Sequence, residues 1–254
     1  MSNYSLVNTY FSPTGTTVKV ASAVAKGSGC SVREMDLSAP VTPSELDSNE
    51  ILLAAVPVFG GRVPAVALER LSALKGNGNP AVAIVAYGNR AFDDALLELK
   101  DALEDNGFQV VAAGAFVAEH SIVRSIAAGR PDAHDLEIAE RFGADVIHKL
   151  AGGDLTSVLV PGDPDYRGKA GGDSPHPAAS EVCVSCGTCA QNCPLCAISL
   201  ETPSETDGSK CINCMRCVFI CPTNARRLPD AMLAAVEGML KQVAAEPKQP
   251  ELFF

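Results

Sequence analysis

The sequence contains no tryptophan, only 5% aromatic residues and four histidines. Long apolar runs are missing as well: none reaches the roughly 18 residues that a membrane-spanning helix needs, so we expect no membrane insertion. Basic residues are scarce, with 20 Lys and Arg against 30 Asp and Glu, and the net charge is −10. Because nucleic-acid-binding proteins carry basic stripes, this composition argues against nucleic acid as a partner.

The N-terminus lacks the features of a secretory signal peptide. Residues 1–10 are short, uncharged and strand-like, without the apolar core of such a peptide. We therefore expect a cytoplasmic protein, in a compartment that disfavours structural disulfides. The ten cysteines consequently need another explanation.

The cysteines are concentrated in one part of the chain. Nine of the ten lie between Cys183 and Cys221, and only Cys30 lies elsewhere. The stretch before them is rich in Gly, Pro and Asp and has no apolar period, which is typical of a linker. We therefore predict an N-terminal domain over 1–152, a linker over 153–180, a cysteine-rich domain over 181–229, and a C-terminal helix and tail over 230–254.

Eight of these cysteines form two runs with the same spacing. Each run reads C-x2-C-x2-C-x3-C and is followed by proline; the runs are Cys183, Cys186, Cys189 and Cys193, and Cys211, Cys214, Cys217 and Cys221. Three close cysteines let one loop wrap a cluster of irons, whereas the fourth cysteine ligates the other cluster. Two zinc knuckles are the alternative, but zinc does not need two matched runs of four, each followed by proline.

Residues 181–229 resemble the bacterial two-cluster ferredoxins. The resemblance implies two 4Fe-4S clusters, one on Cys183, Cys186, Cys189 and Cys221, and one on Cys211, Cys214, Cys217 and Cys193. Cys196 has no counterpart in the second run and is interpreted as a small buried residue beside a cluster.

The N-terminal residues predict an anion site. A strand over 4–10 runs into the loop FSPTGTT and then into a segment with helical apolar spacing. Backbone amides at a helix N-terminus, together with hydroxyl groups, can surround a phosphate. No lysine-bearing P-loop or G-x-G-x-x-G motif is present. The hydroxyl-rich loop resembles the phosphate loop of flavodoxins, and its candidate residues are Ser12, Thr14, Gly15, Thr16 and Thr17.

Alternating apolar segments predict the rest of this domain. Strands are expected over 51–58, 81–87 and 108–118, and helices from about 65, over 91–106 and over 131–150. This alternation indicates an α/β fold with a flavodoxin-like doubly wound parallel sheet, followed by a second, smaller ferredoxin-type iron–sulfur domain. Ligands of such sheets bind at the carboxyl ends of the strands.

The resemblance to flavodoxins implies a bound flavin mononucleotide (FMN), with two further loops beside its ring. Phe59 and Tyr87 are then candidates to stack on the ring, and Gly60 or Gly61 could allow a peptide to turn. The implied contacts are Pro57, Val58, Phe59, Gly60, Gly61 and Arg62 in one loop, and Tyr87, Gly88, Asn89 and Arg90 in the other. The alternative is an α/β domain that binds another phosphate, or no ligand.

Together, the two halves resemble a family of flavodoxin–ferredoxin fusion proteins. That resemblance implies a flavo-iron–sulfur oxidoreductase, expected in anaerobic metabolism, that passes electrons between 4Fe-4S clusters and FMN. Its partner would be a redox protein or a small-molecule electron donor or acceptor. A pure electron carrier without its own substrate and a redox or iron sensor are the alternatives. No nucleophile–base pair for hydrolysis is apparent. His120, after the last predicted strand, could donate a proton or bond the flavin ring, but a lone histidine in a loop is more often an ordinary polar residue.

Overall fold

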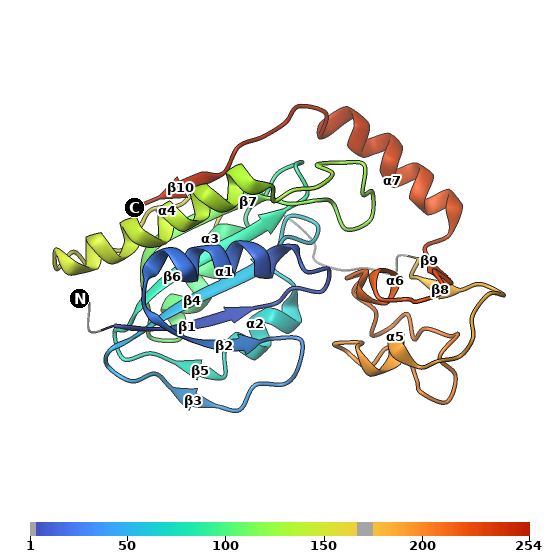
Figure 1. Cartoon of the computed structure of the whole chain (residues 1–254), viewed down its shortest axis with the longest axis horizontal. Coiled ribbons are helices and arrows are strands. Elements are labelled where there is room, and N and C mark those ends of the chain that lie inside the picture. The colour runs from blue at the N-terminus through green and yellow to red at the C-terminus, as the bar shows by residue number, and fades with distance from the viewer. Residues whose placement is uncertain (1–3, 167–174) are drawn as a thin grey trace.

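A computed structural model of the chain describes residues 4–166 and 175–254 (Figure 1); residues 167–174 of the predicted linker lie outside this description. The centre is a six-stranded sheet in the order β10-β7-β6-β4-β1-β2, parallel throughout except where β10 pairs with β7. The strands are Ser5–Tyr10 (β1), Ser31–Asp36 (β2), Glu50–Pro57 (β4), Pro80–Tyr87 (β6), Gln109–Val117 (β7) and Glu251–Phe253 (β10). The five parallel strands follow the flavodoxin-like order of doubly wound folds.

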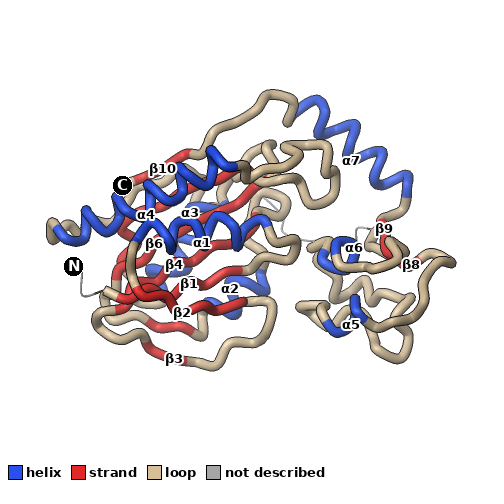
Figure 2. Tube along the Cα trace, viewed as in Figure 1, coloured by secondary structure: helices blue, strands red, loops and turns tan. Residues whose placement is uncertain are grey.

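Helices cover both faces of this sheet (Figures 1 and 2). Helices α1 (Thr16–Ser28) and α4 (Ala133–Ala151) pack with one set of strand residues, and α2 (Ala65–Leu71) and α3 (Ala95–Asp105) pack with the other. Strands β4 and β6 are buried along nearly their whole length because a sheet covered on both faces presents neither side to water. The predicted α/β class is confirmed.

Two glycines let α1 and α4 approach each other closely. A Cβ atom on Gly27 would lie 1.8 Å from the carbonyl oxygen of Glu140, and one on Gly143 would lie 2.1 Å from that of Val24. Neither position has room for a side chain. This contact fixes α1, and with it the loop that leads into α1, against the sheet.

The strands predicted in the N-terminal domain are confirmed to within one residue at each end. Strands β2 and β10 were not predicted: β2 is charged and exposed, and β10 has three residues. A further parallel pair joins β3 (Ser44–Glu45) to β5 (Leu74–Lys75). No helix of the described residues is long and apolar enough to cross a membrane.

The cysteine-rich unit contains little regular structure. Its short helices α5 (Thr188–Gln191) and α6 (Arg216–Phe219) each begin two residues after the second cysteine of a run. Strands β8 (Ala178–Ala179) and β9 (Arg226–Arg227) form an antiparallel pair. Because β8 lies within the predicted linker, the folded unit includes residues ahead of Glu181.

This unit lies at the carboxyl end of the parallel strands (Figure 1). Arg70 donates a hydrogen bond to the Pro194 carbonyl oxygen at 2.6 Å, and Arg216 donates one to the Ser38 hydroxyl at 2.8 Å. Helix α7 (Asp230–Val243) then leads back to the sheet, where β10 pairs with β7. Side-chain hydrogen bonds and the C-terminal segment that follows it therefore connect the cysteine-rich unit to the α/β domain.

Candidate cofactor sites

The structure gathers eight of the cysteines into two groups of four. Each group combines the first three cysteines of one run with the last cysteine of the other, which is the crossed arrangement of two-cluster sites. One cavity is lined by Cys183, Cys186, Cys189 and Cys221, and the other by Cys211, Cys214, Cys217 and Cys193. Each group of cysteines surrounds a cavity, but within the described residues no three His, Cys, Asp or Glu side chains form a group that could hold a single metal ion.

The backbone of the two runs repeats as closely as their cysteine spacing. Ser185 and Asn213, each two residues after the first cysteine of its run, have φ values of 50° and 52°. Equivalent turns follow at Cys196 and Asn224, with φ values of 50° and 54°. Cys196 is exposed and lines neither cysteine cavity, so the structure shows a turn position and not the buried neighbour of a cluster.

Backbone N–H groups support the last cysteine of each run. The N–H groups of Ala197 and Ala225 donate to the sulfur atoms of Cys193 and Cys221, each at 3.2 Å. Hydrogen bonds to ligand sulfurs influence the reduction potential of a cluster. The repeat therefore provides matching sulfur environments in both cysteine groups.

The buried thiols favour the protonated state in the absence of a cation. Burial raises the pKa of Cys214 to about 11 and that of Cys217 to about 12. Metal ligation requires the thiolate. Iron bound here must displace protons from these sulfurs, and the chemistry of the donor set fits a thiolate-held cluster.

A separate cavity of ≈250 Å³ lies where β1, β4, β6 and β7 end. This volume is close to the lower end of ligand pockets, about 300 Å³. Most of the predicted FMN contacts line it, namely Thr14, Thr16, Pro57, Val58, Phe59, Gly60, Gly61, Tyr87, Gly88 and Arg90. Ser12, Gly15, Thr17, Arg62 and Asn89 are not among the lining residues.

The FSPTGTT loop forms the start of α1. Gly15 occupies the N-cap with a φ of 82°, and no side chain caps the helix from that position. The Ser12 hydroxyl accepts a hydrogen bond from the Val18 N–H at 3.0 Å. The N–H groups of Thr16 and Thr17 have no intrahelical acceptor by geometry, and the helix dipole favours an anion beside them.

Arg62 stabilises its loop and does not reach the cavity. Its guanidinium pairs with Glu98, and the Glu98 carboxylate also accepts a hydrogen bond from the Val63 N–H at 2.8 Å. The hydrogen bond with Glu98 raises the pKa of Arg62. The same guanidinium lies 4.9 Å from the ring centroid of Tyr166. Arg62 therefore fixes the loop that follows β4 onto α3.

The Tyr87 ring lies in the core. Its exposed fraction is 2%, and the ring packs edge-on against Phe92 with centroids 5.5 Å apart. The hydroxyl is buried without a hydrogen-bond partner among the described residues, and burial raises its pKa to about 12. This leaves the half-buried Phe59 as the aromatic side chain of the cavity that is available to a ligand.

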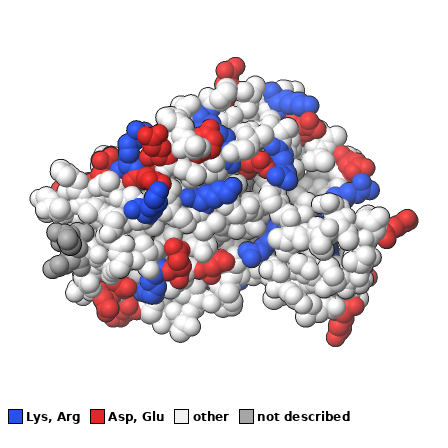
Figure 3. Space-filling model, viewed as in Figure 1, with Lys and Arg blue, Asp and Glu red and all other residues white. Residues whose placement is uncertain are grey.

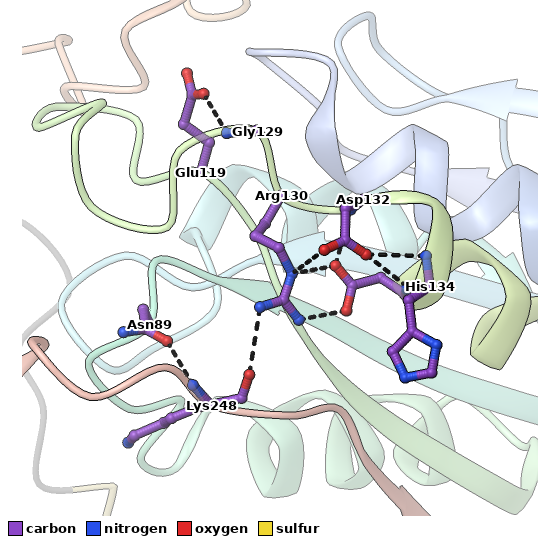
Figure 4. A network of polar contacts seen from close by, with 8 residues as sticks. Asn89, Glu119, Gly129, Arg130, Asp132, His134 and Lys248 are labelled. Atoms are coloured by element: carbon purple, nitrogen blue, oxygen red, sulfur yellow. Dashed lines mark hydrogen bonds and ion pairs between the residues drawn. The ribbon is translucent and has the colours of Figure 1, made fainter.

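Asn89 contacts the C-terminal tail. Its side-chain amide donates to the carbonyl oxygens of Ala244 at 2.8 Å and Glu246 at 3.0 Å. Its oxygen accepts a hydrogen bond from the Lys248 N–H at 3.1 Å (Figure 4). Arg130, paired with Asp135, also donates to the Lys248 carbonyl oxygen. The loop after β6 therefore holds the tail that leads into β10.

His120 also lines the cavity and has one defined tautomer. Its Nδ1 accepts hydrogen bonds from the N–H groups of Ile122 at 3.2 Å and Val123 at 3.1 Å. The ring proton must therefore lie on Nε2. Burial lowers the pKa of His120 to about 4, so the ring is a neutral donor near neutral pH.

The remaining wall of the cavity comes from the C-terminal part of the chain. Cys214 lines it together with Val236, Met239 and Leu240 of α7. The cavity thus lies between the α/β domain and one of the two cysteine groups. The apolar spacing of α7 is visible in the sequence, but its position over this cavity has no local signal.

Comparison with known proteins finds a family match in the cysteine-rich unit and several solved structures that are similar to the α/β domain. Residues 205–227 match the 4Fe-4S binding domain family. Among curated proteins, none matches this chain. Similar solved structures include a flavodoxin from the domain Archaea (17% identity, TM-score 0.43) and one from Streptococcus pneumonia TIGR4 (16%, 0.42), each covering 58% of this chain and 99% of its own. Oxidised flavodoxin 1 from Bacillus cereus covers 57% and 97%, at 17% identity and a TM-score of 0.40.

The strand order and the 4Fe-4S match together define the class of the chain. It combines a flavodoxin-like α/β domain with a ferredoxin-type 4Fe-4S region. Because 4Fe-4S clusters are redox centres, the matched region implies electron transfer.

Proposed function

We propose that the chain binds one FMN in the ≈250 Å³ cavity and one 4Fe-4S cluster on each cysteine group, and that it passes electrons between them. Bound FMN exchanges one or two electrons, whereas each cluster carries one. The protein would thereby couple one-electron carriers to a one- or two-electron acceptor.

The shared cavity carries this proposal. Cys214, a member of one cysteine group, lines the same cavity as Phe59 and the phosphate loop. Electron transfer benefits from a short separation between donor and acceptor, and Cys214 provides a direct connection between the two sites. The group that lies next to the flavin would therefore be the one that contains Cys214, namely Cys211, Cys214, Cys217 and Cys193.

The residues of the α/β domain fit FMN. The N–H groups and hydroxyls at the start of α1 suit a phosphate monoester, and Phe59 offers a ring for stacking. His120 presents a fixed hydrogen-bond donor, while Gly60 and Gly61 have positive φ values of 60° and 84°. These residues bind and orient the flavin, and α7 shields it from water.

Anaerobic purification with iron, sulfide and flavin assays tests the proposal. We expect about eight irons and one FMN per chain. Cys214→Ser should slow electron transfer between the clusters and the flavin, whereas Cys196→Ser, at an exposed position, should not. Eight irons without FMN would contradict the flavin site, and fewer than about four irons would contradict both clusters.

The apolar wall of the cavity favours a second candidate function, that of a pure electron carrier. Val236, Met239 and Leu240 cover a side of the cavity that a small-molecule substrate would otherwise reach. A carrier would exchange electrons with a redox protein but show no turnover with quinones, disulfides or small dyes. Sustained turnover with any small acceptor would exclude this candidate.

A further inference from the structure

A buried arginine lies within the cysteine-rich unit. Arg226 is only 2% exposed, although arginine is almost never fully buried without a charged partner. Its side chain donates to the Pro177 carbonyl at 3.1 Å, to the Thr206 hydroxyl at 2.5 Å and to the Glu205 carbonyl at 3.0 Å, and it also contacts the Pro203 carbonyl. Each of these acceptors is neutral.

The positive charge has no carboxylate partner in the part of the chain that the structure describes. None of the ion pairs there includes Arg226, and its Nε atom is buried without a hydrogen-bond partner. A buried unpaired charge is strongly unfavourable. A nearby anion and an acceptor for the Nε–H are therefore required for a stable arrangement.

One cysteine group lies beside this charge. Arg226 lines the cavity of Cys183, Cys186, Cys189 and Cys221. The guanidinium is thus placed to interact with the thiolates of this group.

Only the second of the two sequence repeats carries a charge at this position. Arg226 lies five residues after the last cysteine of the second run, and the equivalent position of the first run is the buried Ile198. An apolar side chain therefore suits this position in the first repeat. The arginine in the second repeat has a role that the loop geometry alone does not require.

We propose that Arg226 is the internal counter-ion of the cluster on Cys183, Cys186, Cys189 and Cys221, stabilising its negative charge and raising its reduction potential, with its Nε–H available to a sulfur acceptor. This inference rests on the proposed clusters. A cluster held by four thiolates is negatively charged and becomes more so on reduction, so a buried cation favours the reduced state. Net charge and hydrogen bonds to sulfur are both determinants of cluster potential.

Anaerobic redox titration of the full chain, followed by EPR, tests the proposal with three variants. Arg226→Gln removes the charge, Arg226→Lys keeps it, and Arg227→Gln removes a charge from the adjacent, exposed arginine. We expect Arg226→Gln to shift the reduction equilibrium about tenfold toward the oxidised state, which is about 59 mV for a one-electron couple. Arg226→Lys and Arg227→Gln should remain within about threefold of the wild type.

Iron and sulfide assays on every sample separate this inference from the proposed function. A wild-type chain without clusters would remove the basis for both. Full iron in Arg226→Gln with an unchanged midpoint would overturn the role of Arg226 while leaving the clusters established.

If Arg226→Gln loses its iron, a second measurement on the wild type decides. Pulsed EPR of the reduced protein labelled with ¹⁵N-arginine should detect a guanidinium nitrogen coupled to a cluster. Arg226→Lys should reduce that signal to at most the contribution of Arg216, which lines the other cysteine cavity. A signal that is absent, or that is unchanged in Arg226→Lys, would overturn the proposal.

Discussion

Replacement of Glu98 by glutamine should destabilise the α/β domain by about 3 kcal/mol. The Glu98 side chain is 7% exposed and accepts hydrogen bonds from Arg62 and from the Val63 N–H. Breaking a buried ion pair by removing one partner costs about 3–5 kcal/mol because the other charge stays buried. We use the lower end of this range because the Arg62 side chain is 19% exposed, so water can partly solvate its unpaired charge. For a chain of this size the melting temperature should fall by about 6–12 °C.

Urea unfolding followed by far-UV circular dichroism measures this loss. The midpoint should fall with little change in the m-value. Glu137→Gln is the matched control, because Glu137 pairs with Arg141 on the same kind of element but both side chains are more than 60% exposed; we expect at most about 0.5 kcal/mol. Equal midpoints for the two variants would refute the assignment of a structural role to the Arg62–Glu98 pair.

Four further predictions follow from particular contacts. Asn89→Ala should speed amide hydrogen exchange over 244–248, since it removes the hydrogen bonds to Ala244, Glu246 and Lys248. Unchanged exchange in the tail would contradict the conclusion that Asn89 holds the tail in place. NMR of ¹⁵N-labelled protein should show His120 as the neutral Nε2–H tautomer until the pH nears 4, and a titration near 6.5 would argue against this. Burial alone would raise the pKa of Glu119, but hydrogen bonds from Gly129 and Arg124 outweigh it and lower the pKa. The carboxylate therefore stabilises the fold above the pKa of the unfolded state, and this contribution is lost as the pH falls through the pKa of the folded state. Glu119→Gln should flatten the pH dependence of the urea midpoint in that acidic range, and parallel curves for the two proteins would disprove this. Reconstitution of iron-free protein should be faster at higher pH, because burial raises the pKa of Cys214 and Cys217; a rate independent of pH would contradict the need to displace those protons.

Local patterns in the sequence were sufficient to predict much of the architecture. The apolar runs of β4, β6 and β7 are continuous because those strands are covered on both faces, so their bounds could be predicted from composition. The two cysteine runs are equally local, since each loop must wrap its ligands within a few residues.

Side-chain roles in the cofactor loops could not be predicted in this way, because distant partners determine them. The GNR segment after β6 suggests a ring-binding loop, yet Asn89 contacts Ala244, 155 residues later in the chain. Arg62 pairs with Glu98 across 36 residues, and the Tyr87 ring packs inward against Phe92. Loop composition indicates where a ligand site lies but not which side chains face it.

On the surface, the view in Figure 3 shows acidic and basic side chains interspersed over the α/β domain, whereas the cysteine-rich unit is mostly uncharged. Exposed ion pairs are weak and screened by salt. The buried Arg226 and the Arg62–Glu98 pair are screened much less.

Strand β10 also has a consequence for biosynthesis. The outer edge of β7, at Ala113–Ala115, pairs with residues 251–253, which leave the ribosome only after α4, the cysteine-rich unit and α7. Until then this edge presents unpaired backbone groups, and such edges promote aggregation. Residues far along the chain thus close an edge formed much earlier, and delayed maturation of the cysteine-rich unit would prolong the time for which a nascent chain depends on chaperones.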